Sequence, residues 1–184
     1  MLVVDDSILE KAHTDANALL CTHYDHRLGR SVKGLNFVSL LYVVGPVSVP
    51  VTVELVQKTK AVTDPKMHKV SDKSPLTKNE MLRAQLRVAQ QQVAYRYLPA
   101  DSWYASAENM ALVRELGHAF ILALPTSRTV ALSEAARQQG VFQALDTVAF
   151  PDGQSVRVWL RGTAEAVLVV RQVFPNKDGS QGVL

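Results

Sequence analysis

Short apolar runs separated by polar segments set the expected order of elements along the chain. Met1–Val4 predicts a short buried strand, and residues 7–33 are polar and irregular in pattern. Two runs rich in β-branched and aromatic residues follow, Leu35–Tyr42 and Val47–Val56. The Gly45-Pro46 pair between them marks a turn, so the two runs predict an antiparallel hairpin.

Helical spacing begins after this hairpin. Residues 77–80 (Thr-Lys-Asn-Glu) fit the capping-box pattern, in which the threonine covers the Glu80 amide and the glutamate reaches back. The helix that they open is expected to run to about Val93. Strands and helices then alternate, with a strand at Ala94–Ala100, a helix at Ala107–Leu116, a buried strand at Phe120–Leu124 and a short helix at Ser133–Gln139.

The last third of the chain is richer in strand-like runs. These runs are Thr147–Phe150, Val156–Leu160 and Ala166–Phe174, and turn dipeptides with glycine separate them. An early antiparallel hairpin followed by alternating strands and helices predicts an α/β fold. We expect a mixed sheet flanked by helices.

Composition changes little in this picture. Apolar residues make up 47% of the 184 and charged residues 20%, as in ordinary globular proteins, and the formal charge is +3. The single cysteine, Cys21, excludes a disulfide framework and a Cys-rich zinc site, and it fits a reduced, cytoplasmic protein. The sequence has no apolar run long enough to span a bilayer and no signal-peptide pattern, so we expect no membrane partner.

Lysines are concentrated in residues 58–78, where only Asp64 and Asp72 oppose them. Pro65 and Pro75 argue against regular structure, so this segment is expected to be an exposed basic loop. Two interpretations fit it, a solvated surface loop or a contact with a phosphate backbone. The second interpretation assigns DNA binding to Lys66, Lys69 and Lys73.

Carboxylates follow two of the predicted strands. Asp5 and Asp6 come after the first strand, and Asp101 comes after a later one. Because ligands gather at the carboxyl ends of strands in α/β sheets, these acids are expected to meet if their strands are neighbours. Mg²⁺ or Mn²⁺ would relieve their repulsion, and two such ions suit phosphodiester chemistry. The alternative is that each aspartate only forms a turn or caps a helix.

Other catalytic patterns are missing from the sequence. It contains no P-loop, no dinucleotide-binding fingerprint, no nucleophile elbow and no zinc-protease motif. His23 and His26 are interpreted as loop histidines, because no second pair of ligands matches their spacing.

Four stretches resemble the catalytic region of DDE transposases from bacterial insertion sequences, namely LVVDDSILEK, GLNFVSLLY, RVAQQQVAYRYLPADSWYASAENM and VFPNKDGS. The resemblance implies an RNase H-like domain that cleaves and joins DNA strands with Mg²⁺ or Mn²⁺. It also implies oligomers acting on insertion-sequence ends and target DNA. Asp6, followed by Ser7, fits the first catalytic and metal-binding acid best, with Asp5 as the other choice, and Asp101 matches the second.

The third acid of the family is a glutamate, often within a Tyr-Arg-Glu-Lys signature, and the sequence has no such segment. We therefore expect a transposase fragment truncated at both ends and inactive alone. Residues 1–184 would be a partial catalytic domain, with core residues 1–124 and the start of a β-rich insertion at 125–184. Two alternatives remain, a non-catalytic remnant that at most binds DNA through the basic loop, and an unrelated small α/β hydrolase with a metal-phosphate site.

Overall fold

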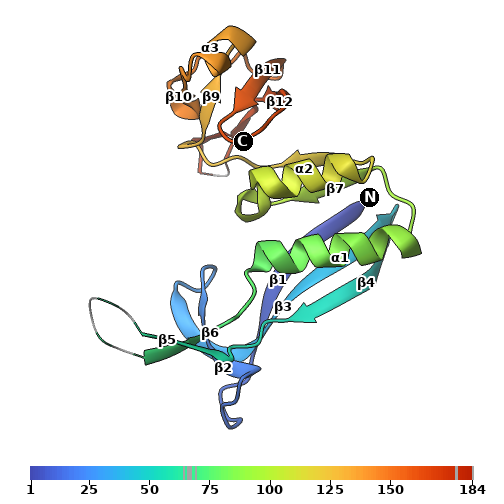
Figure 1. The fold of residues 1–184 in the computed structure, drawn as a ribbon, viewed down its shortest axis with the longest axis vertical. Helices are drawn as coiled ribbons and strands as arrows, with labels where there is room; N and C mark the ends of the chain where they lie inside the picture. Colours follow the sequence, from blue (N-terminus) through green and yellow to red (C-terminus); the bar gives the residue numbers. More distant parts are fainter. Residues whose placement is uncertain (64, 66–67, 69, 177, 184) are drawn as a thin grey trace. The chain divides into compact units, whose positions relative to one another are not determined.

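The computed structural model describes residues 1–63, 65, 68, 70–176 and 178–183. The chain forms two compact units, Met1–Ala100 with Leu112–Ile121 and Asp101–Ala111 with Leu122–Leu184. Strands predominate over helices, and the fold is mixed α/β (Figure 1). None of the helices within the described ranges is long and apolar enough to cross a membrane.

The first unit is built on a four-stranded antiparallel sheet. Its strands are β1 (Leu2–Glu10), β2 (Leu20–Asp25), β3 (Arg30–Val44) and β4 (Val47–Leu55). The long strand β3 pairs with β1 along one edge, and with β2 and then β4 along the other. The predicted hairpin is confirmed as β3 and β4, and Gly45 turns between them with a φ of 54°.

The first 33 residues differ from the prediction. β1 continues to Glu10 instead of ending at Val4, and β2 occupies part of the stretch predicted to be irregular. Long-range pairing explains both differences, because all nine residues of β1 are in register with β3, from Leu2 opposite Tyr42 to Glu10 opposite Gly34. The two aspartates therefore lie inside a strand and not after one.

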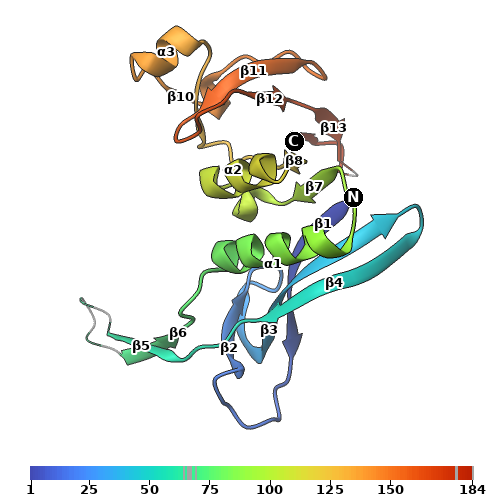
Figure 2. The ribbon, with the colours of Figure 1, turned by 45° about the vertical axis from the view of Figure 1, so that its right-hand side comes forward.

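Helix α1 (Lys78–Gln92) covers one face of this sheet (Figures 1 and 2). The predicted capping box is confirmed, with the Thr77 side chain accepting from the Glu80 amide and the Glu80 side chain accepting from the Thr77 amide. Leu82 and Leu86 are fully buried against the sheet. Between them, Gln85 accepts a hydrogen bond from Thr52 of β4 at 2.9 Å and donates one to the Val38 carbonyl of β3 at 3.1 Å.

Two short strands extend the first unit beyond β1. β7 (Tyr97–Ala100) lies beside β1 and pairs with β8 (Ala119–Leu122) (Figures 1 and 2). Helix α2 (Ala107–Glu115) connects them, and it begins after Ser106, whose hydroxyl accepts from the Asn109 amide at 3.1 Å. The strand predicted at 120–124 is shorter than expected and is not buried, since the side chain of Ile121 is 59% exposed.

The second unit carries most of the remaining strands. One sheet has the order β10-β9-β11-β12 and is formed by β9 (Thr129–Ala131), β10 (Gln143–Ala144), β11 (Ser155–Leu160) and β12 (Val167–Val170). Helix α3 (Glu134–Gln138) confirms the short helix, and β13 (Val173–Pro175) pairs with β14 (Gln181–Val183). The strand predicted at Thr147–Phe150 is wrong, because a 3-10 helix at Leu145–Thr147 ends there and Val148 donates back to the Leu145 carbonyl.

Candidate active site

The alternation of β1 separates the two adjacent aspartates onto opposite faces of the sheet. Leu2 and Val4 are buried, and Asp6 follows them at the same spacing of two residues. Asp6 also lies directly opposite Val38 of β3, whose carbonyl is bonded to Gln85 of α1. Asp6 is therefore on the face that α1 covers.

The carboxylate of Asp6 forms an ion pair with Lys78, the first residue of α1. Both side chains are largely shielded, with 25% of the Asp6 side chain and 23% of the Lys78 side chain exposed. The ammonium group of Lys78 donates to Asp6 Oδ2. The Lys78 ammonium group is thus a counter-ion of the Asp6 carboxylate.

Asp5 lies on the opposite face of β1 and is exposed. Its Oδ2 accepts a hydrogen bond from the Ser7 hydroxyl at 3.3 Å, and its carbonyl accepts one from the Ser39 hydroxyl at 3.3 Å. These contacts are local to the β1–β3 pair, so Asp5 and Asp6 do not share a site.

Asp101 belongs to the second unit and directly follows β7. It is the N-cap of a 3-10 helix at Ser102–Tyr104, and its Oδ1 accepts from the Trp103 amide at 2.9 Å. The capping role considered from sequence is thus present. Asp101 is exposed.

Most of the chain matches a known family. The family model described as DDE superfamily endonuclease matches residues 1–141. The chain belongs to this family. No curated protein and no solved structure matches it.

Members of the DDE superfamily act on DNA and generally use divalent metals. The Asp6 carboxylate is a hard oxygen donor of the kind that Mg²⁺ and Mn²⁺ prefer, and in this structure it is paired with the Lys78 ammonium group. Among the described residues, no group of three or more His, Cys, Asp or Glu side chains lies close enough to hold a metal ion. The donor chemistry fits, while the described residues do not assemble a complete ligand set.

The basic segment of this DDE domain is partly regular. β5 (Lys60–Thr63) and β6 (Val70–Lys73) form an antiparallel hairpin within the segment predicted to be a loop. Lys73 is exposed, and it lies directly opposite Lys60, also exposed. Lys66 and Lys69, the other two predicted DNA contacts, lie outside the described residues.

One buried cluster was not anticipated. His23 is not a loop residue: it lies in β2 and is only 6% exposed. Its Nε2 is 3.3 Å from the Cys21 sulfur, and its Nδ1 is 3.4 Å from the side-chain nitrogen of Asn36. Burial lowers the pKa of His23 to about 4, with smaller contributions from Lys58 and Lys78, so the imidazole is neutral at pH 7.

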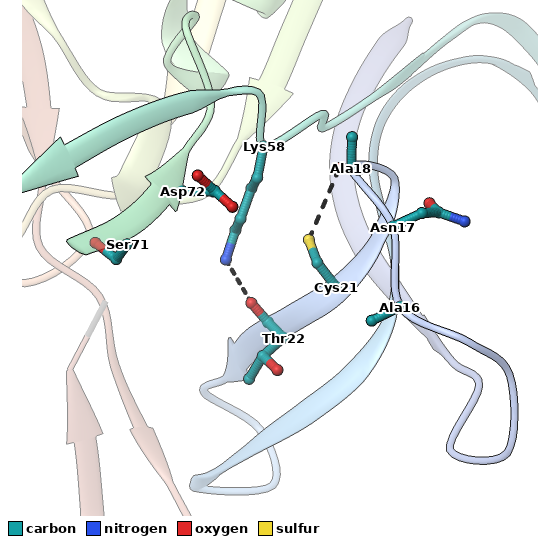
Figure 3. A pocket seen from close by; sticks show the side chains of 8 residues that line it. All are labelled: Ala16, Asn17, Ala18, Cys21, Thr22, Lys58, Ser71 and Asp72. Atoms are coloured by element: carbon teal, nitrogen blue, oxygen red, sulfur yellow. Dashed lines mark hydrogen bonds between the residues drawn. The ribbon is translucent and has the colours of Figure 1, made fainter.

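The pocket beside this cluster contains none of the predicted acids. Figure 3 shows its lining residues, which are Ala16, Asn17, Ala18, Cys21, Thr22, Lys58, Ser71 and Asp72. The Lys58 ammonium group donates to the Thr22 carbonyl, and the Cys21 sulfur lies 3.9 Å from the Ala18 carbonyl (Figure 3). Burial raises the pKa of the Cys21 thiol, which disfavours the thiolate form that acts as a nucleophile.

Proposed function

We propose that this chain is the catalytic part of an insertion-sequence transposase, with Asp6 and Asp101 as two of its metal-binding acids. The observation that carries the proposal is the position of Asp6 in strand β1 of a DDE-family chain, on the face covered by α1 and paired with a cation. A divalent metal held by these acids would activate the attacking oxygen and stabilise the leaving oxygen of a DNA phosphodiester.

The strand arrangement supports an RNase H-like interpretation of the first unit. Three antiparallel strands run in the order β4-β3-β1, β7 lies beside β1, β8 pairs with β7, and α1 crosses one face of the sheet. Asp101 comes directly after β7, the strand that neighbours β1. The proposed shared role of the two acids thus rests on their places along the chain, Asp6 within β1 and Asp101 directly after its neighbour β7.

The family needs three acids, and the sequence assigns only two. With two carboxylates, the charge of a bound metal pair is less well compensated, so we expect weak metal binding and slow strand cleavage by these 184 residues alone. Asp6 would still hold a metal through its carboxylate. Strand transfer requires the same acids and is expected to be weaker in proportion.

A plasmid-nicking assay with Mg²⁺ or Mn²⁺ tests this assignment. Asp6→Asn and Asp101→Asn should remove the residual cleavage, because each variant loses one ligand charge without changing side-chain size. Asp5→Asn is the matched control, since it makes the same change at the adjacent residue on the opposite face and should cleave like the parent. Equal cleavage by the parent and Asp6→Asn would show that Asp6 has no catalytic role.

A second function, DNA binding without catalysis, is favoured by the β5–β6 hairpin. Lys60 and Lys73 lie directly opposite each other, and like charges in that position destabilise a strand pair. A phosphate group between the two ammonium groups would remove this cost, so the hairpin suits contact with a nucleic-acid backbone. A parent chain that binds DNA but shows no metal-dependent cleavage would support this function over the first.

A further inference from the structure

The start of α1 carries a charge that the helix itself disfavours. The N-terminal turn of a helix has positive partial charge, so anionic side chains are favourable there and cations are not. Glu80 follows this rule and closes the capping box. Lys78 breaks it, since it is the first helical residue, and its ammonium group is directed to the Asp6 carboxylate.

The position of Lys78 at the start of α1 also limits the positions that its ammonium group can reach. Its backbone is fixed between the Thr77 cap and the first turn of α1, and its ammonium group is on the face of the sheet that holds Asp6. Its four-carbon stem remains flexible, so the ammonium group can leave the carboxylate and still stay close to it. The positive charge of Lys78 also acts on His23, because it contributes to lowering the pKa of that buried imidazole.

We propose that Lys78 is an internal counter-ion of Asp6 that a divalent metal must displace, and that the released ammonium group then binds a DNA phosphate. This inference rests on the proposed role of Asp6 as a metal ligand. A metal at Asp6 Oδ2 would be within a few ångströms of the ammonium group, where the shielded site makes the repulsion between them strong. A DNA phosphate brought to the metal supplies the anion that the displaced lysine needs.

The consequence is an ordered response to ligands. Without metal, Lys78 neutralises Asp6 and keeps a shielded carboxylate from being left uncompensated. With metal, the same lysine becomes an additional phosphate contact beside the reacting group. Lys78 is therefore a positioning residue, because it acts on the metal ligand and on the DNA and not on the reacting atoms.

Mn²⁺ binding, followed by the electron paramagnetic resonance of free Mn²⁺, tests the first half. Lys78→Gln should bind Mn²⁺ about fivefold tighter than the parent, because the metal then has no ammonium group to displace from the Asp6 carboxylate. Lys78→Arg keeps the competing charge and should bind like the parent. Lys33→Gln is the charge-matched control, because Lys33 lies in β3 at a position whose side chain alternates to the other face from Val38.

Asp6→Asn separates this inference from the proposed function. If Asp6→Asn binds Mn²⁺ more weakly than the parent while Lys78→Gln binds equally, the counter-ion role is wrong and the role of Asp6 stands. If Asp6→Asn binds as well as the parent, or if no chain binds Mn²⁺, both are wrong. Circular dichroism of Lys78→Gln should show unchanged helix content, since the capping residues are untouched.

The salt dependence of DNA binding, measured with and without Ca²⁺, tests the second half. Each phosphate contact contributes about 0.9 to the slope of log K against log salt on duplex DNA, so Lys78→Gln should lose about that amount when Ca²⁺ is present. Without metal its slope should equal that of the parent, because Lys78 is then held by Asp6. An equal loss under both conditions, or no loss under either, would contradict the exchange of partners.

Discussion

Acidification should destabilise the first unit through His23. The buried imidazole has its pKa lowered from 6.5 to about 4, first by desolvation and then by the charges of Lys58 and Lys78. The unfolded chain therefore binds a proton on this side chain at a higher pH than the folded chain does. Because the folded pKa is the lower one for a base, stability is fully present above pH 6.5 and is lost as the pH falls toward 4.

The two pKa values set the size of the effect. Linkage between pKa values of 6.5 and about 4 gives a loss of about 2 kcal/mol in the free energy of unfolding between pH 7 and pH 5. That is a large part of the 5–15 kcal/mol typical of a domain, as an order of magnitude. The range stops at pH 5 because carboxylates begin to bind protons below it.

Urea unfolding at pH 7, 6 and 5 measures this loss. His23→Gln should be less stable than the parent at pH 7 but should lose about 2 kcal/mol less between pH 7 and pH 5. His26→Gln is the matched control, because it makes the same substitution at a histidine that is exposed. A His23→Gln variant with the same pH dependence as the parent would refute the reasoning.

Two further predictions concern the cap of α1 and the basic hairpin. Thr77→Ala removes the side chain that accepts from the Glu80 amide at 3.2 Å, so it should lower the free energy of unfolding by about 1 kcal/mol in urea titrations; an unchanged value would contradict a stabilising cap. Replacing Lys66, Lys69 and Lys73 together with Gln should reduce the salt slope of DNA binding with or without metal, and an unchanged slope would exclude these lysines from the DNA interface.

The start of α1 follows from a local signal, whereas the extent of β1 depends on a distant partner. The capping box needs only the four consecutive residues from Thr77 to Glu80, so the start of α1 was predicted correctly. The extent of β1 was not, since its last residues are held by β3, more than 20 positions away. The polar composition of residues 7–33 concealed β2, the end of β1 and the start of β3 for the same reason.

His23 shows how the same limit affects a site. Its polar neighbours in the sequence suggested a loop, whereas its burial comes from the pairing of β2 with β3, which brings it beside Asn36. The spacing of Cys21 and His23 by two residues places both on one face of a strand. That spacing would have indicated their contact only if the strand itself had been recognised.

The choice between Asp5 and Asp6 follows from the same alternation. If the strand ended at Val4, both aspartates would belong to a loop, and only the Ser7 that follows Asp6 would favour it, through the family resemblance. Once β1 continues through them, Asp6 shares a face with Val4, under α1, while Asp5 shares the opposite face with Ser7. A shielded carboxylate needs a counter-charge, and an exposed one does not. Lys78 forms an ion pair with Asp6, so Asp6 is the aspartate of the two that has a cation beside it.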